Sequence, residues 1–262
     1  MPALTTTTSA PEAPARKPLH QAGSFARELL FVVVGAIIVS SLLRAFVGQM
    51  FIIPSGSMEN TLLKGDRVVV QKITHLQRGE VVVFADPADW LGGEGTEERG
   101  PVGKALEFVG VLPDTSKGHL IKRVIGLPGD TVKCCDAKGR MSVNGQPLDE
   151  TSYLYTGPDG SQVASSDFPF EVVVPRDRIF VMGDHRDLSA DSRCHLTDLS
   201  TTQKKGEVAF IPENLVVGPA FAIAAPFDRA KRLRVPATFA AVPAPAKPAP
   251  DEATIKPADV HC

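Results

Sequence analysis

The longest uncharged stretch of the chain lies near its beginning and is followed at once by short β-like runs. Residues 29–43 read LLFVVVGAIIVSSLL, and Arg44 separates them from an apolar stretch that ends at Ile53. A membrane-crossing helix needs about 20 apolar residues, and residues 29–48 reach that length if Arg44 extends its charge to the membrane surface. We therefore expect an uncleaved anchor at 29–48. The alternatives are a buried core helix and a cleaved secretory signal, but no small-x-small cleavage site lies at the right distance.

The composition is that of a folded protein. Charged residues make up 22% of the chain, hydrophobic residues 43%, and the formal net charge is -2. These values exclude a disordered chain and give no reason to expect a nucleic-acid partner. We expect a disordered tail at 1–28, which begins rich in Thr, Ala and Pro, and a basic then Ala/Pro-rich tail at 229–262.

The four cysteines predict neither a metal site nor a disulfide scaffold. Cys134 and Cys135 are adjacent, whereas paired zinc ligands are usually separated by two to four residues. In an oxidising compartment, one of these two cysteines could pair with Cys194. A bond between Cys134 and Cys135 themselves is sterically disfavoured.

After Ile53 the sequence changes to short runs rich in Val, Ile and Phe, bounded by Gly, Pro and Asp, which is typical of strands. The segment 142–148 carries Asn-Gly between β-like flanks, a strong hairpin signal. We expect a mainly β fold: a domain of twisted antiparallel sheets at 49–228, with a smaller β insertion at about 132–176. Two polar stretches, 87–117 and 149–168, are expected to be long loops. The predicted strands are 66–72, 80–85, 119–126, 170–175, 178–183, 207–212 and 216–225.

Two serines follow the apolar segment directly, in FIIPSGSMENTLLKGD at 51–66. Pro54 and Gly56 predict a tight, irregular backbone around Ser55 and Ser57. A serine on such a turn, at the edge of a β domain, is well placed to present its hydroxyl group. The alternative interpretation is a Ser/Gly-rich linker beside the membrane.

A Lys-Arg pair lies within the β-like run 119–126. Side chains alternate along a strand, so Lys122 shares a face with Leu120 and Val124, and Arg123 points to the other face. A cation among apolar neighbours is costly unless it is paired or neutral. Lysine can lose its proton when buried, whereas arginine cannot, so a base at this position must be Lys122. The alternative is a pair of exposed edge-strand cations.

Polar residues are concentrated in VMGDHRDLSADSRCH at 181–195. This density is typical of a hydrogen-bonded loop that supports a site, or of a calcium-binding loop. The calcium interpretation is weak because arginines are mixed with the carboxylates and the spacing is not that of an EF-hand.

Five segments in this order resemble the successive conserved boxes of bacterial type I signal peptidases, with features similar to the high-GC Gram-positive members. The resemblance covers about residues 29–228. Two departures from the family pattern, His185 and Leu188, lie in the polar loop. The matching segments are PSGSM, TLLKGD, IKRVIGLPGD, GDHRDLSADSR and VVGPAFAIAAPF.

The resemblance implies a Ser/Lys dyad with Ser57 as nucleophile and Lys122 as general base. It implies that the Ser55 hydroxyl and the Ser57 N–H hold the oxyanion, and that Ser189 orients the lysine amine. It further implies a bracing ion pair between two residues of the polar loop. That pair is Asp191 and Arg193, and the remaining supporting positions are Met58, Arg123 and Asp184.

The resemblance also implies an activity: removal of N-terminal signal peptides from exported pre-proteins, after small residues at positions -1 and -3, through an acyl-enzyme. No cofactor is implied. The implied partners are pre-proteins and the lipid bilayer, with the secretion translocon as a candidate. The implied location is the bacterial cell membrane, with a single pass, a cytoplasmic N-terminus and an extracytoplasmic catalytic domain.

Three rival interpretations remain open. A soluble Ser/Lys self-cleaving repressor should carry an N-terminal DNA-binding domain, and the chain has an apolar segment there. A penicillin-recognising enzyme should carry Ser-x-x-Lys, which neither Ser55 nor Ser57 begins. A membrane-tethered β domain without catalytic activity would leave Ser57 in a linker.

Overall fold

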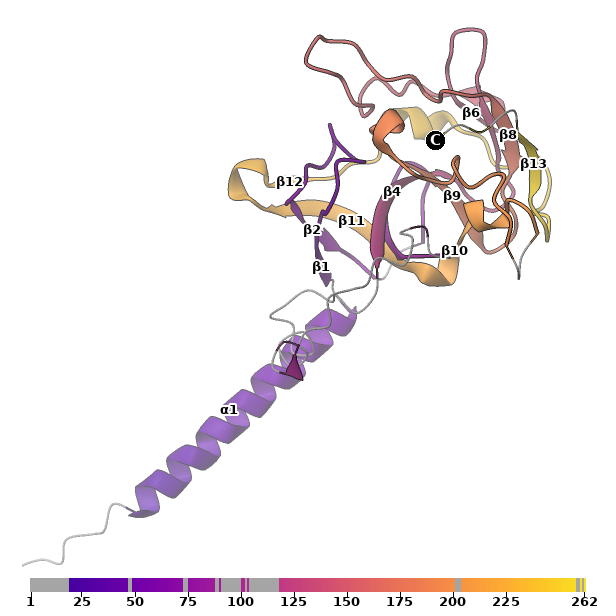
Figure 1. The fold of residues 1–262 in the computed structure, drawn as a ribbon. Helices are drawn as coiled ribbons and strands as arrows, with labels where there is room; N and C mark the ends of the chain where they lie inside the picture. Colours follow the sequence, from indigo (N-terminus) through magenta and orange to yellow (C-terminus); the bar gives the residue numbers. More distant parts are fainter. Residues whose placement is uncertain are drawn as a thin grey trace, which may run out of the picture.

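The computed structural model describes residues 19–46, 49–72, 75–87, 90, 100, 101, 103, 118–200, 204–257, 260 and 262. A long helix extends away from a β-rich body (Figure 1). The helix is α1 (Leu19–Phe46). The strands are β1 (Gln49–Ile52), β2 (Arg67–Val70), β3 (Val81–Ala85), β4 (His119–Gly126), β5 (Thr131–Cys134), β6 (Ser142–Val143), β7 (Gln146–Pro147), β8 (Phe170–Val173), β9 (Arg178–Met182), β10 (Ile211–Pro212), β11 (Val216–Ala225), β12 (Lys231–Arg232) and β13 (Thr254–Pro257). Short 3₁₀ helices are η1 (Arg186–Leu188), η2 (Glu207–Ala209), η3 (Glu213–Leu215), η4 (Phe227–Arg229) and η5 (Ala237–Ala241).

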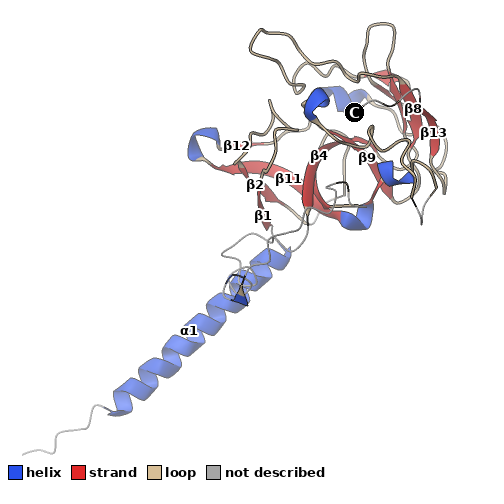
Figure 2. Cartoon of the chain, in the orientation of Figure 1, coloured by secondary structure: helices blue, strands red, loops and turns tan. Residues whose placement is uncertain are grey.

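The strands form two antiparallel sheets (Figure 2). The larger sheet has the order β1-β2-β11-β3-β4-β9-β10, and β12 pairs with β11. The smaller has the order β13-β8-β5-β6-β7. The prediction of a mainly β, antiparallel fold is therefore confirmed, and most of the second sheet comes from the expected insertion at 132–176.

Most of the predicted strands are present, because their Val, Ile and Phe side chains are buried on at least one face of a sheet. The Asn-Gly hairpin is also confirmed: Asn144 and Gly145 have φ angles of 52° and 79° between β6 and β7, as a type I′ turn requires. The strand expected at 207–212 is wrong in its first half. There, backbone N–H groups bond to carbonyls three residues back, which forms η2 and leaves only β10 extended.

The long strand β11 crosses the larger sheet and pairs with β2, β3 and β12. Its register shifts on both of its main neighbours. At one shift, Gly218 has φ +151°, and a Cβ there would lie 2.0 Å from the carbonyl oxygen of Gln71. Only glycine permits this approach, which bends β11 around the core.

Helix α1 includes the last ten residues of the expected N-terminal tail, 19–28. No proline occurs between Pro18 and Pro54, so nothing in the sequence interrupts a helix there. The expectation of disorder at 1–28 is wrong for residues 19–28, and residues 1–18 lie outside the described part. The described apolar side chains of α1 are exposed, for example Leu30 at 60% and Val32 at 68%. Among the residues that the structure describes, no helix combines the length and apolarity that crossing a membrane requires.

The C-terminal segment packs on the domain instead of forming the tail expected at 229–262. Strand β13 pairs with β8 along its whole length and so extends the smaller sheet. Phe239 is 5% exposed, and a Cβ at Gly79 would lie 2.5 Å from its ring. An Ala/Pro-rich segment has little periodic apolar pattern, so these few contacts could not be predicted from the sequence.

Both expectations for the cysteines are wrong. Cys134 is bonded to Cys135, and Cys194 is bonded to Cys262. The second pairing follows from the position of the C-terminal segment: Ile255 and Leu196 both lie against Gly206. This contact brings the end of the chain beside the polar loop, which the sequence pattern did not indicate.

Candidate active site

A closed loop between β1 and β2 holds the two candidate serines. Ile53 donates its N–H to the carbonyl of Asp66, and its own carbonyl accepts the N–H of Gly65, both at 2.9 Å. Met58 and Leu62 are fully buried in the core beneath this loop. Because these apolar side chains fix the backbone on either side, Ser57 lies at a defined place and is only 4% exposed. The linker interpretation of this segment therefore does not hold.

Lys122 meets Ser57 from a central strand of the larger sheet. β4 lies between β3 and β9, and Lys122 pairs with Val82 of β3. The side chain is 3% exposed, and its Nζ lies 2.6 Å from Ser57 Oγ. The two residues are 65 positions apart in the sequence. The alternative of exposed edge-strand cations is therefore wrong.

Burial lowers the pKa of Lys122 from its ordinary value to about 8. The cause is the loss of water around the charged amine, and the positive charge of Arg193 acts in the same direction. The carboxylates of Asp191 and Asp184 oppose the shift but do not cancel it. With a pKa of about 8, about one amine in ten is neutral at pH 7, and the neutral amine is the form that a general base requires.

Ser55 lies beside Ser57. Its Oγ is 3.4 Å from Ser57 Oγ, a long hydrogen-bond contact. The N–H of His185 donates to the Ser57 carbonyl at 3.1 Å. The loop that carries Ser57 is thus attached to the polar loop at 181–195 through the backbone itself.

Arg123 points to the opposite face of β4, as predicted from strand alternation. Its Nε and Nη2 donate to the two carboxylate oxygens of Asp184 at 2.8 and 2.6 Å. Its Nη1 donates to the Gly79 carbonyl at 2.6 Å, and Thr61 also donates to Asp184. The guanidinium further lies 4.5 Å from the centre of the Tyr153 ring. This bidentate pair connects the Ser57 loop, β4 and the polar loop.

The carboxylate of Asp191 accepts several of the hydrogen bonds that hold the polar loop together. This fully buried carboxylate accepts the N–H of Gly183 at 2.9 Å, the hydroxyl of Ser189 at 2.8 Å and Arg193 Nε at 3.0 Å. Burial alone would raise the pKa of Asp191, but the Arg193 charge and these hydrogen bonds hold it below its ordinary value. The Asp191–Arg193 pair is thus formed. The Ser189 hydroxyl donates to Asp191, so its expected contact with the lysine amine stays a prediction.

Several residues of the site escaped sequence reasoning. Gly183 is one: a Cβ there would lie 2.2 Å from Ser189 Oγ and 2.6 Å from the Ser57 carbonyl oxygen. The His185 ring stacks on Tyr155 with centroids 3.7 Å apart and contacts Glu59 Oε2 through Nδ1 at 3.0 Å. The only available signal was the density of polar residues in the loop, which does not identify such distant partners.

A second missed group is the buried pair of Arg186 and Glu150, which holds the polar loop against the segment 149–168. The pair is joined at 2.5 Å, and the Tyr153 hydroxyl donates to the same glutamate oxygen at 2.7 Å. The expected loop at 149–168 is thus part of the support. The other expected loop, 87–117, lies almost wholly outside the described residues.

Among the residues that the structure describes, no group of three or more His, Cys, Asp or Glu side chains is arranged to hold a metal ion. Two acidic residues of the polar loop are instead paired with arginine: Asp184 with Arg123 and Asp191 with Arg193. The third, Asp187, lies 3.3 Å from His185 Nε2. The calcium-loop interpretation therefore finds no support in this part of the chain.

Comparison with known proteins assigns the chain to a family. Residues 26–225 match the model of the family described as "Signal peptidase, peptidase S26". The chain belongs to this S26 family. The S26 match runs from α1 to the end of β11 and thus includes the Ser57 loop, β4 and the polar loop.

The curated relatives of this S26 chain include signal peptidase I of Mycobacterium tuberculosis strain H37Rv, 36% identical over 195 residues, which cover 67% of this chain and 65% of the relative. Probable signal peptidase I of Mycobacterium leprae is 36% identical over 228 residues, 77% of each chain. Probable signal peptidase I-2 of Synechocystis is 35% identical over 198 residues, 74% of this chain and 71% of the relative. The resemblance to high-GC members is confirmed. The chain spans slightly less than two thirds of the M. tuberculosis relative's length.

We predict that Gly183→Ala destabilises the fold, because the added methyl group meets the Ser57 carbonyl and the Ser189 side chain. Overpacking costs about 1–3 kcal/mol, which corresponds to a melting temperature lower by about 5 °C. The measurement is thermal unfolding followed by circular dichroism. The matched control is Gly35→Ala in α1, where a Cβ meets nothing within 4 Å. Equal melting temperatures of the two variants would contradict the tight packing at Gly183.

Proposed function

We propose that this chain is a serine endopeptidase that removes N-terminal signal peptides from exported pre-proteins. One observation carries the proposal: the buried Lys122 amine lies 2.6 Å from the Ser57 hydroxyl oxygen, and burial lowers its pKa to about 8. A lysine with a lowered pKa that touches a serine hydroxyl can, in its neutral form, activate that hydroxyl as a nucleophile. The S26 family match supports the same activity.

The proposed reaction is acyl transfer in two halves. Ser57 Oγ bonds to the scissile carbonyl carbon while neutral Lys122 accepts the hydroxyl proton. The C–N bond then breaks, and the protonated lysine donates its proton to the leaving amine. In the second half, water attacks the ester carbonyl carbon while Lys122 accepts a water proton. The C–O bond to Ser57 then breaks, the protonated lysine donates that proton to the Ser57 oxygen, and the acid product is released. Each half returns the lysine to its neutral form.

Two donors are proposed for the oxyanion that forms on the carbonyl: the N–H of Ser57 and the hydroxyl of Ser55. The position of Ser55 Oγ, 3.4 Å from Ser57 Oγ, supports this role because it places a second donor beside the reacting atom. In other hydrolases, removing a single such donor lowers kcat about a hundredfold to a thousandfold.

The supporting residues are proposed to hold the dyad from two sides. Arg123 and Asp184 fix β4 against the Ser57 loop. Asp191 and Arg193 fix the polar loop beside Lys122, with Ser189 attached to the same carboxylate. Met58, the residue after Ser57, is fully buried, and we propose that its packing in the core fixes the position of the nucleophile.

A preference for small residues at -1 and -3 agrees with the strand arrangement. β1 is the terminal strand of the larger sheet, and its chain continues into the Ser57 loop. An extended peptide that pairs with such an edge would direct alternate side chains to the same face. We propose that residues -1 and -3 of the pre-protein therefore face the enzyme together, and that the enzyme surface there accepts only small side chains.

We also propose that α1 anchors the chain in the bacterial cell membrane as a single pass at 29–48, with a cytoplasmic N-terminus and an extracytoplasmic β domain. The uncharged run 29–43 and the exposed apolar side chains of α1 support the anchor. The two disulfides support the extracytoplasmic placement, because such bonds persist in oxidising compartments.

The dyad is tested by cleavage of a purified model pre-protein. We expect Ser57→Ala and Lys122→Ala to lower kcat/KM at least about 10³-fold, and Lys122→Arg to be equally inactive because arginine stays protonated. Ser55→Ala should retain more activity than Ser57→Ala. The exposed Ser161→Ala is the matched control and should cleave normally. Full activity of Ser57→Ala would refute the assignment.

The pH profile provides a separate test of the base. Lys122 acts in its neutral form, so the rate should rise with pH and level off above the lysine pKa of about 8. Below that pH, log kcat/KM should fall by about one for each pH unit. The measurement is initial cleavage rate against pH at constant ionic strength. A profile that is flat between pH 6 and 9, a range of about three units around this pKa, would exclude Lys122 as the base.

The anchor is tested by separating membranes from soluble protein. Replacing Val34 and Ile38 of α1 with lysine should release the chain from alkaline-washed membranes, since each central lysine costs about 3 kcal/mol in a bilayer. The same replacement at the exposed residues Leu199 and Phe227 is the control. Equal retention of both variants in the membrane fraction would argue against the anchor.

A further inference from the structure

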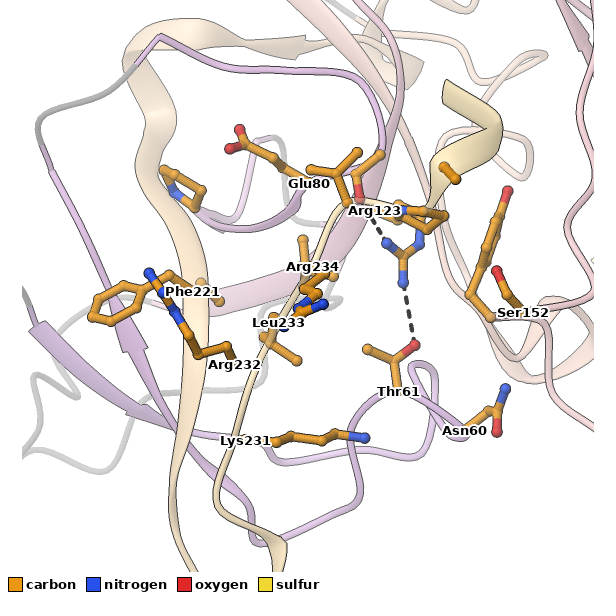
Figure 3. Close-up of a pocket in the computed structure, with 18 of the residues that line it drawn as sticks. Asn60, Thr61, Glu80, Arg123, Ser152, Phe221, Lys231, Arg232, Leu233 and Arg234 are labelled. Atoms are coloured by element: carbon orange, nitrogen blue, oxygen red, sulfur yellow. Dashed lines mark hydrogen bonds between the residues drawn. The ribbon is translucent and has the colours of Figure 1, made fainter. Parts of the chain in front are cut away.

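A basic cavity lies behind the dyad, beside the segment that follows η4. It has a volume of about 630 Å³ and is bounded by β11, by residues 231–237 and by the end of the Ser57 loop (Figure 3). Volumes of about 300–1,000 Å³ are those of small-molecule sites. The cavity is thus large enough for a small ligand and not merely a packing defect.

The cavity is separate from the proposed nucleophile because β4 lies between them. Lys122 points to one face of this strand and contacts Ser57, whereas Arg123 points to the other face and lines the cavity. In Figure 3, Arg123 reaches Thr61 from one wall, while Lys231 extends toward Asn60 from the other. The scissile peptide is therefore not the expected occupant.

The lining of the cavity carries an excess of positive charge. Lys231, Arg232 and Arg234 line it, all three side chains are exposed, and none forms a salt bridge within the described part of the chain. The carboxylate of the lining is Glu80, whose Oε2 accepts the Gln77 N–H and whose pKa is raised by burial. One carboxylate does not neutralise these three cations.

The other charged groups nearby are already compensated. Arg123 is held by both oxygens of Asp184. Asp66 is attracted by Lys231, but its two carboxylate oxygens accept hydrogen bonds from Nε and Nη2 of Arg229. The charge of the three lining cations therefore remains available to a ligand.

We propose that this cavity binds a phosphate-bearing anion. Two guanidinium groups and an amine provide many donors around one concave space, and planar guanidinium forks match phosphate oxygens in pairs. The chemistry is shared by free phosphate and by a phospholipid headgroup. The ligand would also lie next to Thr61 and Arg123, the residues that connect the cavity to Asp184 and the Ser57 loop.

The test compares two triple variants of the full-length chain in neutral detergent. In one variant the three lining cations Lys231, Arg232 and Arg234 become alanine. In the control variant, three exposed lysines elsewhere become alanine, which gives the same change in net charge; these are Lys138, Lys205 and Lys247. Binding of inorganic phosphate is measured by calorimetry in the detergent solution. Binding to vesicles of phosphatidylglycerol or phosphatidylcholine is measured by flotation after the detergent has been removed. A melting curve for each variant confirms folding. If the triple variant of the lining unfolds, the single variant Arg234→Gln replaces it in both binding measurements.

We expect the lining variant to bind phosphate at least about tenfold more weakly than wild type, and the control variant to bind like wild type. If wild type prefers phosphatidylglycerol vesicles and only the lining variant loses that preference, the ligand is a lipid headgroup. If wild type binds phosphate but shows no preference for these vesicles, the ligand is free phosphate. No saturable binding in either arm, or an equal loss in both variants, overturns the proposal. Because no arm measures cleavage, this result is independent of the proposed peptidase activity.

Discussion

The contact between the Lys122 amine and the Ser57 hydroxyl is the interaction on which the rest of the structure depends. Its 2.6 Å distance requires that a cation-forming side chain be buried in the middle of a β-sheet. Burying a charged amine is costly, and the cost is reduced when the amine becomes neutral. The same burial that threatens stability thus produces the lowered pKa that the proposed chemistry needs.

The surroundings of that contact show how the burial is managed. Arg123, Asp184, Asp191 and Arg193 are each at most 2% exposed, and they pair with one another two by two. Buried ion pairs contribute little net stability, but losing one partner is expensive, about 3–5 kcal/mol, because the other charge stays buried. We interpret these pairs as devices that fix position. They hold three separate segments, the Ser57 loop, β4 and the polar loop, in one arrangement.

Alternation along β4 places the two proposed sites on opposite faces of this strand. Lys122 faces Ser57, and its neighbour Arg123 faces the basic cavity. The proposed peptidase site and the proposed anion site are therefore joined by two adjacent residues of the chain. The apolar packing differs accordingly, because Val124 and Ile121, on opposite faces, belong to different core clusters.

The sequence by itself determined the local features: most of the strands, the Asn-Gly turn and the choice of lysine over arginine as the proposed base. These depend on alternation, on φ angles and on an intrinsic pKa, which are properties of neighbouring residues. The preference for Ser57 over Ser55 came from family resemblance, and physics alone would have left it open. Only the tertiary structure decided that Gly183 lies against the Ser57 carbonyl, that β13 completes the smaller sheet and that Cys194 pairs with Cys262. The reason is that these contacts join segments far apart in the chain, where each segment alone carries no pattern that identifies its partner.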